Sequence, residues 1–323
     1  MIISASRRTD IPAFYSDWFM NRIKEGWCLV PNPMNTKQQS RVSLKVDDVD
    51  VIVFWSKNPA PLIPHLSELD RRGFLYYFQY TINDYPLALE PNIPSLDSRI
   101  KTFKLLSGHV TPLRVVWRYD PIIISNFTPI QYHVERFSQI AEELKGYTKR
   151  VMVSVIDYYG KTDRRLTQLE KEEGFTFTRG DELVKDIVYL MKEFSSIAAK
   201  NEIEIFTCAE ETDYSQLGVT PGRCIDTNLM LKCWSLNLKY KKDAFQRPVC
   251  LCATSKDIGV NNTCKHGCTY CYATSNCEIA QKRFNTHDPN SPVLWGIPSE
   301  NQKLPKIVED HDSGQIGLFP LDV

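Results

Sequence analysis

Short apolar runs recur along the first two-thirds of the chain, and each of them ends in polar residues. The runs are rich in β-branched and aromatic side chains, which is typical of strands buried on both faces of a parallel sheet. The sequence predicts six such strands, at 2–6, 49–55, 75–80, 114–117, 151–155 and 203–207. Helical stretches separate the runs, so the pattern indicates successive βα units.

The segments between the runs carry helical spacing and residues that begin or end helices. One segment has Thr128 as the expected cap, Pro129 in the first helical position and Gly146 at its end. Further helices are expected over 61–72, 95–107, 181–194 and 227–238. Gly108 is the expected stop of the second of these helices.

Six βα units in a row predict an α/β fold with a parallel (β/α) barrel or partial barrel of the TIM type. A flat doubly wound sheet is the competing arrangement. Its nucleotide-binding versions are disfavoured, because no Gly-x-Gly-x-x-Gly follows a strand and no phosphate loop is present. We expect residues 1–245 to form the barrel. Residues 246–323 are expected to form a cysteine-rich loop over the barrel mouth and a wrapping tail, both packed on the same domain.

Polar residues at the ends of the predicted strands are candidates for binding and proton transfer, since such ends converge on one mouth in a barrel. We expect the basic side chains to hold an anionic or carboxylate group. The acidic ones are expected to receive amines or ribose hydroxyls, or to move protons. The candidates are Arg7, Arg8, Asp10, Lys57, Arg118, Asp120, Asp157 and Glu210. For each of them, an ion pair that only closes the barrel top is the competing interpretation.

The composition is that of a globular protein without a strong overall charge. Of its 323 residues, 42% are hydrophobic and 24% charged, and the 39 Lys and Arg residues balance 39 Asp and Glu residues. No overall field therefore attracts nucleic acid or a membrane surface. There is no apolar run of transmembrane length, and the first residues do not resemble a signal peptide. We expect a cytoplasmic protein with no membrane partner.

Ten cysteines are present, most of them between Cys224 and Cys277. In a chain without a secretion signal, this clustering favours metal or redox chemistry over disulfides. Cys264, Cys268 and Cys271 have the C-x3-C-x2-C spacing with which radical S-adenosylmethionine (SAM) enzymes hold a four-iron cluster on three thiolates. The fourth iron stays open there and binds SAM. Zinc is the main rival metal, because thiolates suit both.

Three residues beside these cysteines complete the predicted loop. Tyr270 and Tyr272 flank Cys271 and are expected to lie against the cofactor, as an aromatic residue before the last cysteine packs near adenine in radical SAM loops. His266 is a potential zinc ligand, but its place in a tight loop predicts that it faces solvent.

A second group of cysteines is a candidate for another, fully ligated cluster. It consists of Cys208, Cys224, Cys250 and Cys252. The C-x-C pair suits shared metal ligation better than an internal disulfide. The competing interpretation is that one or two of the four are ordinary core residues, which is what we expect of Cys28 and Cys233.

Several motifs together resemble a known family. They are Ser-Arg-Arg-Thr-Asp-Ile-Pro-Ala-Phe-Tyr at 6–15, Phe-Trp-Ser-Lys-Asn-Pro at 54–59, Trp-Arg-Tyr-Asp-Pro at 117–121, Ser-Lys-Asp-Ile-Gly at 255–259 and the cysteine motif at 264–273. Over nearly its whole length the chain resembles the bacterial and archaeal family catalogued as domain of unknown function 1848. The cysteine motif is also distantly similar to radical SAM photolyase-like proteins. In those enzymes the cysteine loop follows the first strand, whereas here it follows the predicted barrel, and no Gly-Gly-Glu element is recognisable.

The expected function is that of an iron–sulfur enzyme of radical SAM type. A 4Fe-4S cluster, with SAM, would generate a 5′-deoxyadenosyl radical that acts on a small-molecule substrate, with electrons from an external donor. Two alternatives stay open. One is a metalloprotein without SAM, in which zinc or a closed cluster stabilises a hydrolase or a binding protein. The other is a protein of nucleic-acid repair or modification, which the neutral charge disfavours because phosphate binding depends on Lys and Arg.

Overall fold

An eight-stranded parallel sheet is the centre of the fold. The computed structural model describes residues 1–36 and 38–298. The strands of the sheet are β1 (Ile2–Ala5), β4 (Val51–Ser56), β5 (Tyr76–Thr81), β6 (Val115–Ile122), β7 (Arg150–Val155), β8 (Glu204–Cys208), β9 (Thr220–Gly222) and β10 (Lys256–Asp257). Their order in space is β10-β1-β4-β5-β6-β7-β8-β9, and all neighbours are parallel.

The α/β class and all six predicted strands are confirmed. Within the described residues β10 and β9 form the two ends of the sheet, which is therefore open there and not a closed barrel. β10, the last strand in the sequence, lies next to β1, the first. The segment after residue 245 thus contributes an edge strand to the sheet. The predicted wrapping tail lies, from residue 299 on, outside the described part of the chain.

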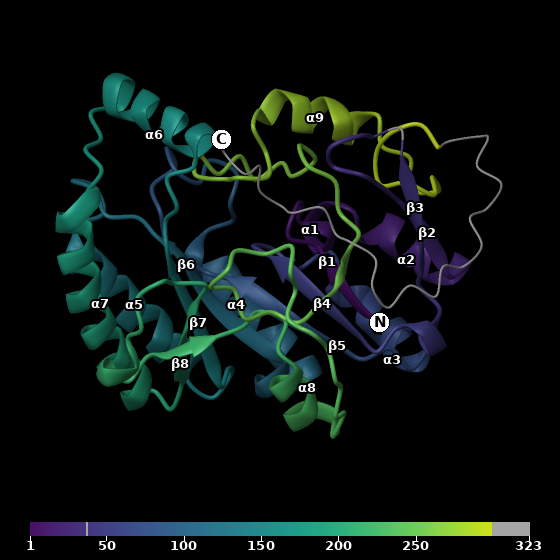
Figure 1. The fold of residues 1–323 in the computed structure, drawn as a ribbon, viewed down its shortest axis with the longest axis horizontal. Coiled ribbons are helices and arrows are strands. Elements are labelled where there is room, and N and C mark those ends of the chain that lie inside the picture. Colours follow the sequence, from purple (N-terminus) through teal and green to yellow (C-terminus); the bar gives the residue numbers. More distant parts are fainter. Residues whose placement is uncertain (37, 299–323) are drawn as a thin grey trace.

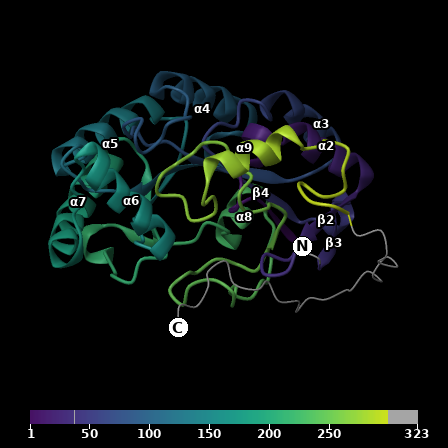
Figure 2. The ribbon, with the colours of Figure 1, turned by 90° about the horizontal axis from the view of Figure 1, so that it is seen from above.

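Helices cover one face of the sheet in an arc (Figures 1 and 2). The helices of the chain are α1 (Ile11–Phe14), α2 (Ser16–Glu25), α3 (Leu66–Arg71), α4 (Leu96–Val110), α5 (Ile130–Leu144), α6 (Gly160–Glu173), α7 (Gly180–Lys200), α8 (Thr227–Trp234) and α9 (Cys277–Asn285). Helices α2 to α5 and α7 form the arc. Their apolar side chains pack with alternate strand residues; Phe137 of α5, for example, stacks on Trp117 of β6.

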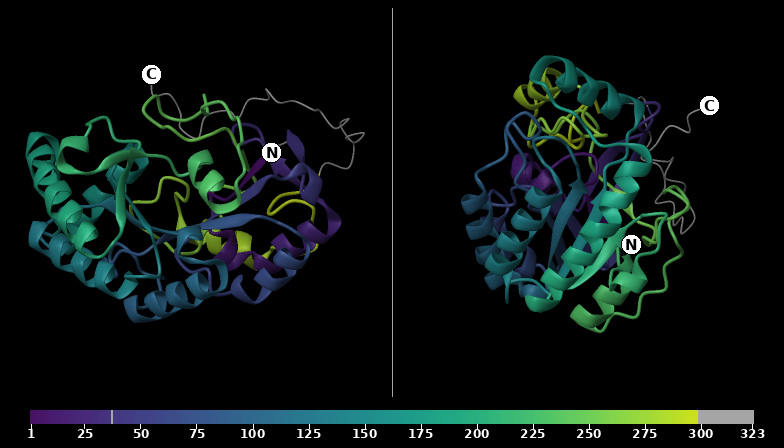
Figure 3. Two further views of the ribbon diagram at one scale, coloured as in Figure 1. Left: turned by 90° about the horizontal axis from the view of Figure 1, so that it is seen from below. Right: turned by 90° about the vertical axis from the view of Figure 1, so that its left-hand side faces the viewer.

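The opposite face, which we call the inner face, is covered by α8 and by the coil that follows it (Figure 3). Val53, Tyr77 and Val116 belong to this face and pack with α8 and with cysteines of the late segment. Because side chains alternate along a strand, Arg118 also points to the inner face, two positions beyond Val116. Polar residues near the carboxyl ends of the strands therefore meet the late cysteines on this face.

Several local predictions were wrong for reasons of packing. The hydroxyl of Thr128 donates to the carbonyl of Ile123 and does not cap α5, which begins after Pro129. Gly108 does not end α4 but lies inside it. The helix ends only at Val110, because Pro112 cannot continue it and disfavours the helical conformation at Thr111. Helix α8 ends at Trp234, four residues before the predicted end.

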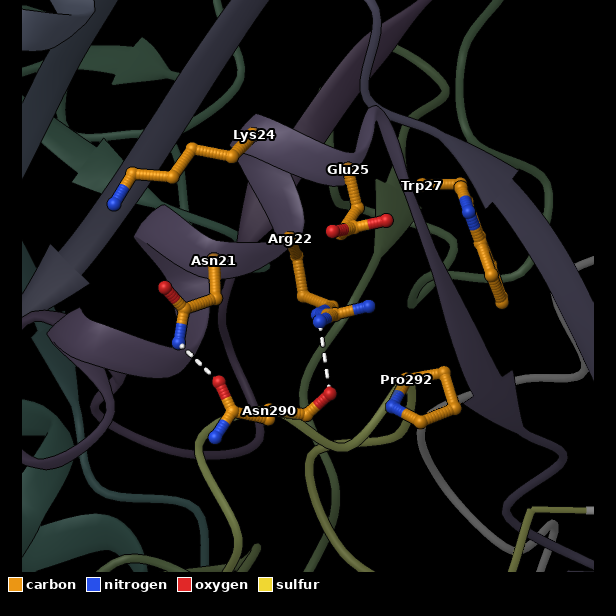
Figure 4. A pocket seen from close by; sticks show the side chains of 7 residues that line it. All are labelled: Asn21, Arg22, Lys24, Glu25, Trp27, Asn290 and Pro292. Atoms are coloured by element: carbon orange, nitrogen blue, oxygen red, sulfur yellow. Dashed lines mark hydrogen bonds between the residues drawn. The ribbon is translucent and has the colours of Figure 1, made fainter.

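A short hairpin, β2 (Trp27–Pro31) and β3 (Gln39–Ser43), completes the fold beside α2. A pocket lies where α2 meets the segment near Asn290 (Figure 4). Two hydrogen bonds join the segments there: Arg22 Nη2 donates to the carbonyl of Asn290 at 2.9 Å, and Asn21 Nδ2 donates to its side-chain oxygen at 3.2 Å. These bonds hold the segment near Asn290 against α2. Separately, none of the helices in the described residues combines the length and the apolar character needed to span a bilayer.

Candidate functional site

The three-cysteine motif lies in a loop, residues 260–275, which we call the cysteine loop. It follows β10, so it begins at the same edge of the sheet as the polar ends of the other strands. The backbone N–H of Thr269 donates to the carbonyl of Leu89 at 3.0 Å, and the hydroxyl of Tyr15 donates to the carbonyl of Thr263 at 2.7 Å. The loop is thereby held against the segments that follow β5 and α1.

Asp257, at the end of β10, holds the chain entering this loop to the end of β1. Its carboxylate accepts hydrogen bonds from the hydroxyls of Ser4 and Ser6, both at 2.7 Å, and from the backbone of Arg7 at 2.8 Å. Arg8 Nε donates to it at 3.1 Å. Burial alone would raise the pKa of Asp257, but Arg8 and the hydroxyls hold it below its usual value. Arg8 thus serves in a buried ion pair.

The thiols of Cys264, Cys268 and Cys271 interact electrostatically within the cysteine loop. Burial raises the pKa of Cys264 well above its ordinary value, and the negative charges of Asp10 and of the other two thiols add to the shift. In the part of the chain that the structure describes, no group of three or more His, Cys, Asp or Glu side chains is arranged around a metal position. The cluster on these thiols therefore stays a prediction.

His266 is buried, which corrects the prediction that it faces solvent. Its side chain is only 4% exposed, and Nε2 lies 2.7 Å from Oδ2 of Asp10. The ring packs on Phe14, with centroids 4.6 Å apart, so tertiary packing overrides the polar character of the local loop. Asp10 also accepts hydrogen bonds from the backbone N–H groups of Lys57 and Ala13, at 2.8 and 2.9 Å. The candidate Asp10 is thus a junction of three segments.

Lys57, at the end of β4, is paired with a carboxylate that the sequence did not reveal. Its Nζ lies 2.8 Å from Oε1 of Glu90, which is almost fully buried, and the hydroxyl of Tyr270 donates to the same oxygen. Burial would raise the pKa of Glu90, but Lys57 and then Arg99 lower it below its ordinary value. Glu90 lies in the coil after β5 and not at a strand end, so no pattern pointed to it.

Tyr272 and Arg7 connect the cysteine loop to the inner face. The hydroxyl of Tyr272 donates to the carbonyl of Arg7 at 2.7 Å. The guanidinium of Arg7 lies over the ring of Trp55, 5.2 Å from its centroid. Burial would lower the pKa of Arg7, but the charges of the Cys252 and Cys224 thiols raise it above its ordinary value. The Arg7 side chain therefore lies within electrostatic reach of the second cysteine group.

Arg118 and Asp120 form a buried ion pair inside β6, since the strand extends past the predicted end to Ile122. Arg118 Nε donates to Asp120 Oδ2 at 2.9 Å, and the hydroxyl of Ser154 donates to the other carboxylate oxygen. Arg118 Nη1 also lies 2.8 Å from Sγ of Cys224. Burial disfavours the charged form of both partners. Asp120 nevertheless raises the pKa of Arg118, and Arg118 lowers the pKa of Asp120, so both stay charged.

The second cysteine group comes together on the inner face. Sγ of Cys208 and Sγ of Cys224 are 2.9 Å apart. The thiol of Cys252 lies within hydrogen-bonding reach of both Cys224 and Cys250. The hydrogen bond with Cys224, together with Arg118, lowers the pKa of Cys208 to about 7 against the effect of burial. All four predicted members are therefore neighbours in a chain of contacts.

Cys28 and the last two acidic candidates have other packing or hydrogen-bond partners, although the charge of Cys208 also contributes to the raised pKa of Glu210. Cys28 is fully buried in the main core, as predicted. Asp157 is paired with Arg247, whose Nη1 lies 2.6 Å from Oδ2. Glu210 accepts the backbone N–H of Val155 at 2.9 Å, and burial raises its pKa to about 7. Arg247 belongs to the irregular coil after α8 and had no signal in the sequence.

A family model described as a domain of unknown function, DUF1848, matches residues 2–273. The chain belongs to this family. No curated protein and no solved structure matches it. The DUF1848 region includes both cysteine groups and ends two residues after Cys271, so it leaves Cys277 outside.

Proposed function

We propose that this DUF1848 protein is an iron–sulfur enzyme of radical SAM type, with a four-iron cluster held by Cys264, Cys268 and Cys271. The observation that carries the proposal is the position of β10. It is last in the sequence but lies beside β1 at one end of the parallel sheet, and the cysteine loop leaves from its carboxyl end.

This topology bears on the late position of the cysteine loop, which is the main difference from radical SAM photolyase-like proteins. In radical SAM photolyase-like proteins the cysteine loop follows the first strand in sequence. In the order of this sheet in space, β10 comes before β1, so the loop again follows the first strand. The late position of the motif in the sequence is therefore compatible with that position in space, because β10 and β1 are parallel neighbours and end at the same edge of the sheet.

The donor set fits such a cluster. Three thiols in one loop would leave one iron of a bound cluster without a protein ligand, and the cluster, reduced by an external donor, would supply the electron for SAM cleavage. The chain's own residues would bind and orient what reacts there. Lys57, whose Nζ is paired with Glu90, would hold an anionic group between the loop and the inner face; its charge acts to lower the pKa of both Cys268 and Asp120, which supports this role.

Tyr272 would form the wall between the loop and the inner face. Its side chain is 43% exposed, which leaves it accessible to a cofactor, and its hydroxyl donates to the carbonyl of Arg7 at 2.7 Å. Tyr270 has its hydroxyl on Glu90 and its ring edge-on to Tyr85, with centroids 6.0 Å apart. We assign Tyr270 to holding the loop in place and Tyr272 to contact with the cofactor.

The test is anaerobic reconstitution of the full chain with ferrous iron and sulfide, followed by reduction in the presence of SAM. We expect about four iron and four sulfide per chain at the loop, and release of 5′-deoxyadenosine. The variant C264A/C268A/C271A should lose that iron and all SAM cleavage. Cys233→Ser, a half-buried cysteine of α8 outside both groups, is the matched control and should retain both.

Two results would overturn the proposal. One is a C264A/C268A/C271A variant that keeps the iron and sulfide of the wild type. The other is a wild-type chain that binds zinc and takes up no iron with sulfide, which would favour the alternative of a metalloprotein without SAM. The four contacting thiols of the second group are the observation that supports this alternative.

A further inference from the structure

Four thiols from three separate stretches of chain meet on the inner face. Cys208 ends β8, Cys224 follows β9, and Cys250 and Cys252 precede β10. Three of them are at most 8% exposed: Cys224, Cys250 and Cys252. A single buried cysteine commonly acts as a small apolar side chain, whereas four thiols brought together from distant segments form a potential set of metal ligands.

Arg7 supplies an independent observation beside this group. Its side chain is 9% exposed, and neither Nη1 nor Nη2 has a hydrogen-bond partner among the described residues. The nearest carboxylate oxygen, Oδ2 of Asp243, is 3.9 Å from Nη1. A buried guanidinium with unused N–H groups is costly. Ionised Cys252 and Cys224 are the charges that stabilise the guanidinium most, so an acceptor on the side of the thiols would satisfy it.

Other donors point at the same sulfurs. Arg118 Nη1 lies 2.8 Å from Sγ of Cys224. The backbone N–H groups of Cys224 and Ile225 donate to Sγ of Cys252, at 3.3 and 3.5 Å. Hydrogen bonds of this kind stabilise the thiolate form of a metal ligand and fix its orientation.

We infer that Cys208, Cys224, Cys250 and Cys252 are the four ligands of a second metal centre, closed by thiolates and supported by Arg7 and Arg118. Four thiolates around zinc, or around a four-iron cluster of the same charge, leave two negative charges. Arg7 offsets one of them, and Arg118, which is also paired with Asp120, donates to Cys224 from Nη1. With all positions filled by protein, such a centre has no open site for substrate. It stabilises the inner face or carries electrons, and it does not depend on the cysteine loop.

The distance between the sulfurs of Cys208 and Cys224 shows how far these side chains must move for a metal to bind. Around tetrahedral zinc, with Zn–S bonds of about 2.3 Å, sulfurs lie about 3.8 Å apart. Cys208 and Cys224 are closer, at 2.9 Å, and sit in direct contact. Entry of zinc therefore needs these two side chains to separate by about 1 Å, and entry of a four-iron cluster, whose thiolates bind different irons, needs a larger separation. The alternative use of this contact is a disulfide between the two residues, which the experiment must distinguish.

The experiment uses the full chain with C264S/C268S/C271S, so that the cysteine loop cannot contribute metal. This background is loaded with zinc alone in one arm and with ferrous iron and sulfide in the other. We expect one zinc, or about four iron with four sulfide, per folded chain. Adding C250S/C252S should abolish uptake, whereas adding Cys233→Ser should not. The thermal unfolding curve of each variant shows whether it is folded.

Three outcomes would overturn the inference. They are a folded background that takes up no metal in either arm, uptake that survives C250S/C252S, and a Cys208–Cys224 disulfide in anaerobically purified protein found by mass spectrometry. Because the loop cysteines are absent throughout, none of these results bears on the proposed function. Conversely, loss of SAM cleavage in the loop variant leaves this centre intact.

The role of Arg7 has its own test. Arg7→Gln should weaken metal affinity in this background by about 10- to 100-fold, the usual effect of losing a group that supports a ligand. Arg41→Gln is the matched control, because Arg41 also lies over a tryptophan, Trp27, but on the exposed hairpin. An affinity that Arg7→Gln leaves unchanged would overturn neutralisation by Arg7.

Discussion

His266 in the cysteine loop and Asp10 before α1 are joined side chain to side chain, with Nε2 and Oδ2 2.7 Å apart. The same carboxylate accepts the backbone N–H of Lys57 after β4 and that of Ala13 in α1. One side chain therefore connects the ends of two neighbouring strands to the loop that carries three cysteines. This carboxylate is thus one of the long-range contacts that position the loop, together with the bonds to Leu89 and Tyr15.

Asp10→Ala should lower the free energy of unfolding by about 2–4 kcal/mol, because it removes a helix cap and leaves buried partners without an acceptor. Amide hydrogen exchange over residues 260–275 should become faster than in the rest of the sheet. Urea unfolding and exchange mass spectrometry measure the two effects. Asp47→Ala, at an exposed aspartate, is the control and should change stability by less than about 0.5 kcal/mol. If amide exchange over the cysteine loop is unchanged in Asp10→Ala, Asp10 does not hold the loop in place.

Gly259→Ala should destabilise the protein by roughly 3 kcal/mol. An added Cβ would lie 2.0 Å from Oγ of Ser6, which cannot move away because it donates to Asp257 at 2.7 Å. Gly108→Ala is the matched control: its Cβ would meet nothing within 4 Å, and it lies within α4. It should stabilise the protein by about 0.5–1 kcal/mol. Chemical denaturation of both variants checks the contrast in sign, and equal effects would contradict it.

The sequence predicted the main strands because each is a dense apolar run of four or more residues. β10 has only two residues, Lys256 and Asp257, and no such run marks it. Its pairing with β1 joins segments about 250 residues apart, which no local pattern reveals. That single pairing decides where the cysteine loop lies, so the sequence alone placed the motif after the barrel and not at the edge next to β1.

The candidate residues at strand ends were found because parallel strands bring their carboxyl ends together. The partners of those residues were not. Glu90, Asp243 and Arg247 lie in irregular coil, and their meaning appears only when the chain is folded. His266 was misjudged for the same reason, since a polar loop residue next to Phe14 and Asp10 becomes buried through contacts with residues more than 250 positions away.

Lys57→Met should cost about 3 kcal/mol, because it leaves the buried carboxylate of Glu90 without its main partner. The double variant K57M/E90Q should lose clearly less than the sum of the single variants, by about 1–3 kcal/mol. Urea unfolding of the wild type, the two single variants and the double variant measures this coupling. Additive losses would show that the pair contributes nothing beyond its separate members.

Lys104→Met is the matched control for this pair. Lys104 also contacts a glutamate, Glu143, and lies near the ring of Tyr147, but this arrangement is on the protein surface. Exposed pairs contribute less than about 1 kcal/mol. The comparison therefore separates the effect of burial from the effect of the lysine–glutamate–tyrosine arrangement itself.

Stability should fall as the pH decreases from 7 to 4, in part because of His133. This side chain is fully buried in α5, where Nδ1 accepts from the hydroxyl of Tyr119 and Nε2 donates to the carbonyl of Ile123, both at 2.9 Å. Burial lowers its pKa from 6.5 to about 4. Between these values the unfolded chain binds a proton that the folded chain does not, so acid favours unfolding by up to about 3 kcal/mol.

Urea unfolding at pH 7, 6, 5 and 4 measures this dependence. His133→Gln should be less stable than the wild type at pH 7, because it disturbs a buried hydrogen-bonded site, but its stability should fall less steeply with acid. His65→Gln, at a histidine whose side chain is 33% exposed beside Asp17, should retain the wild-type slope. The slope and not the absolute stability decides the matter, since packing defects shift the whole curve whereas a missing titration changes its steepness. An equal slope in His133→Gln and the wild type would mean that His133 takes up its proton equally in the folded and unfolded chains.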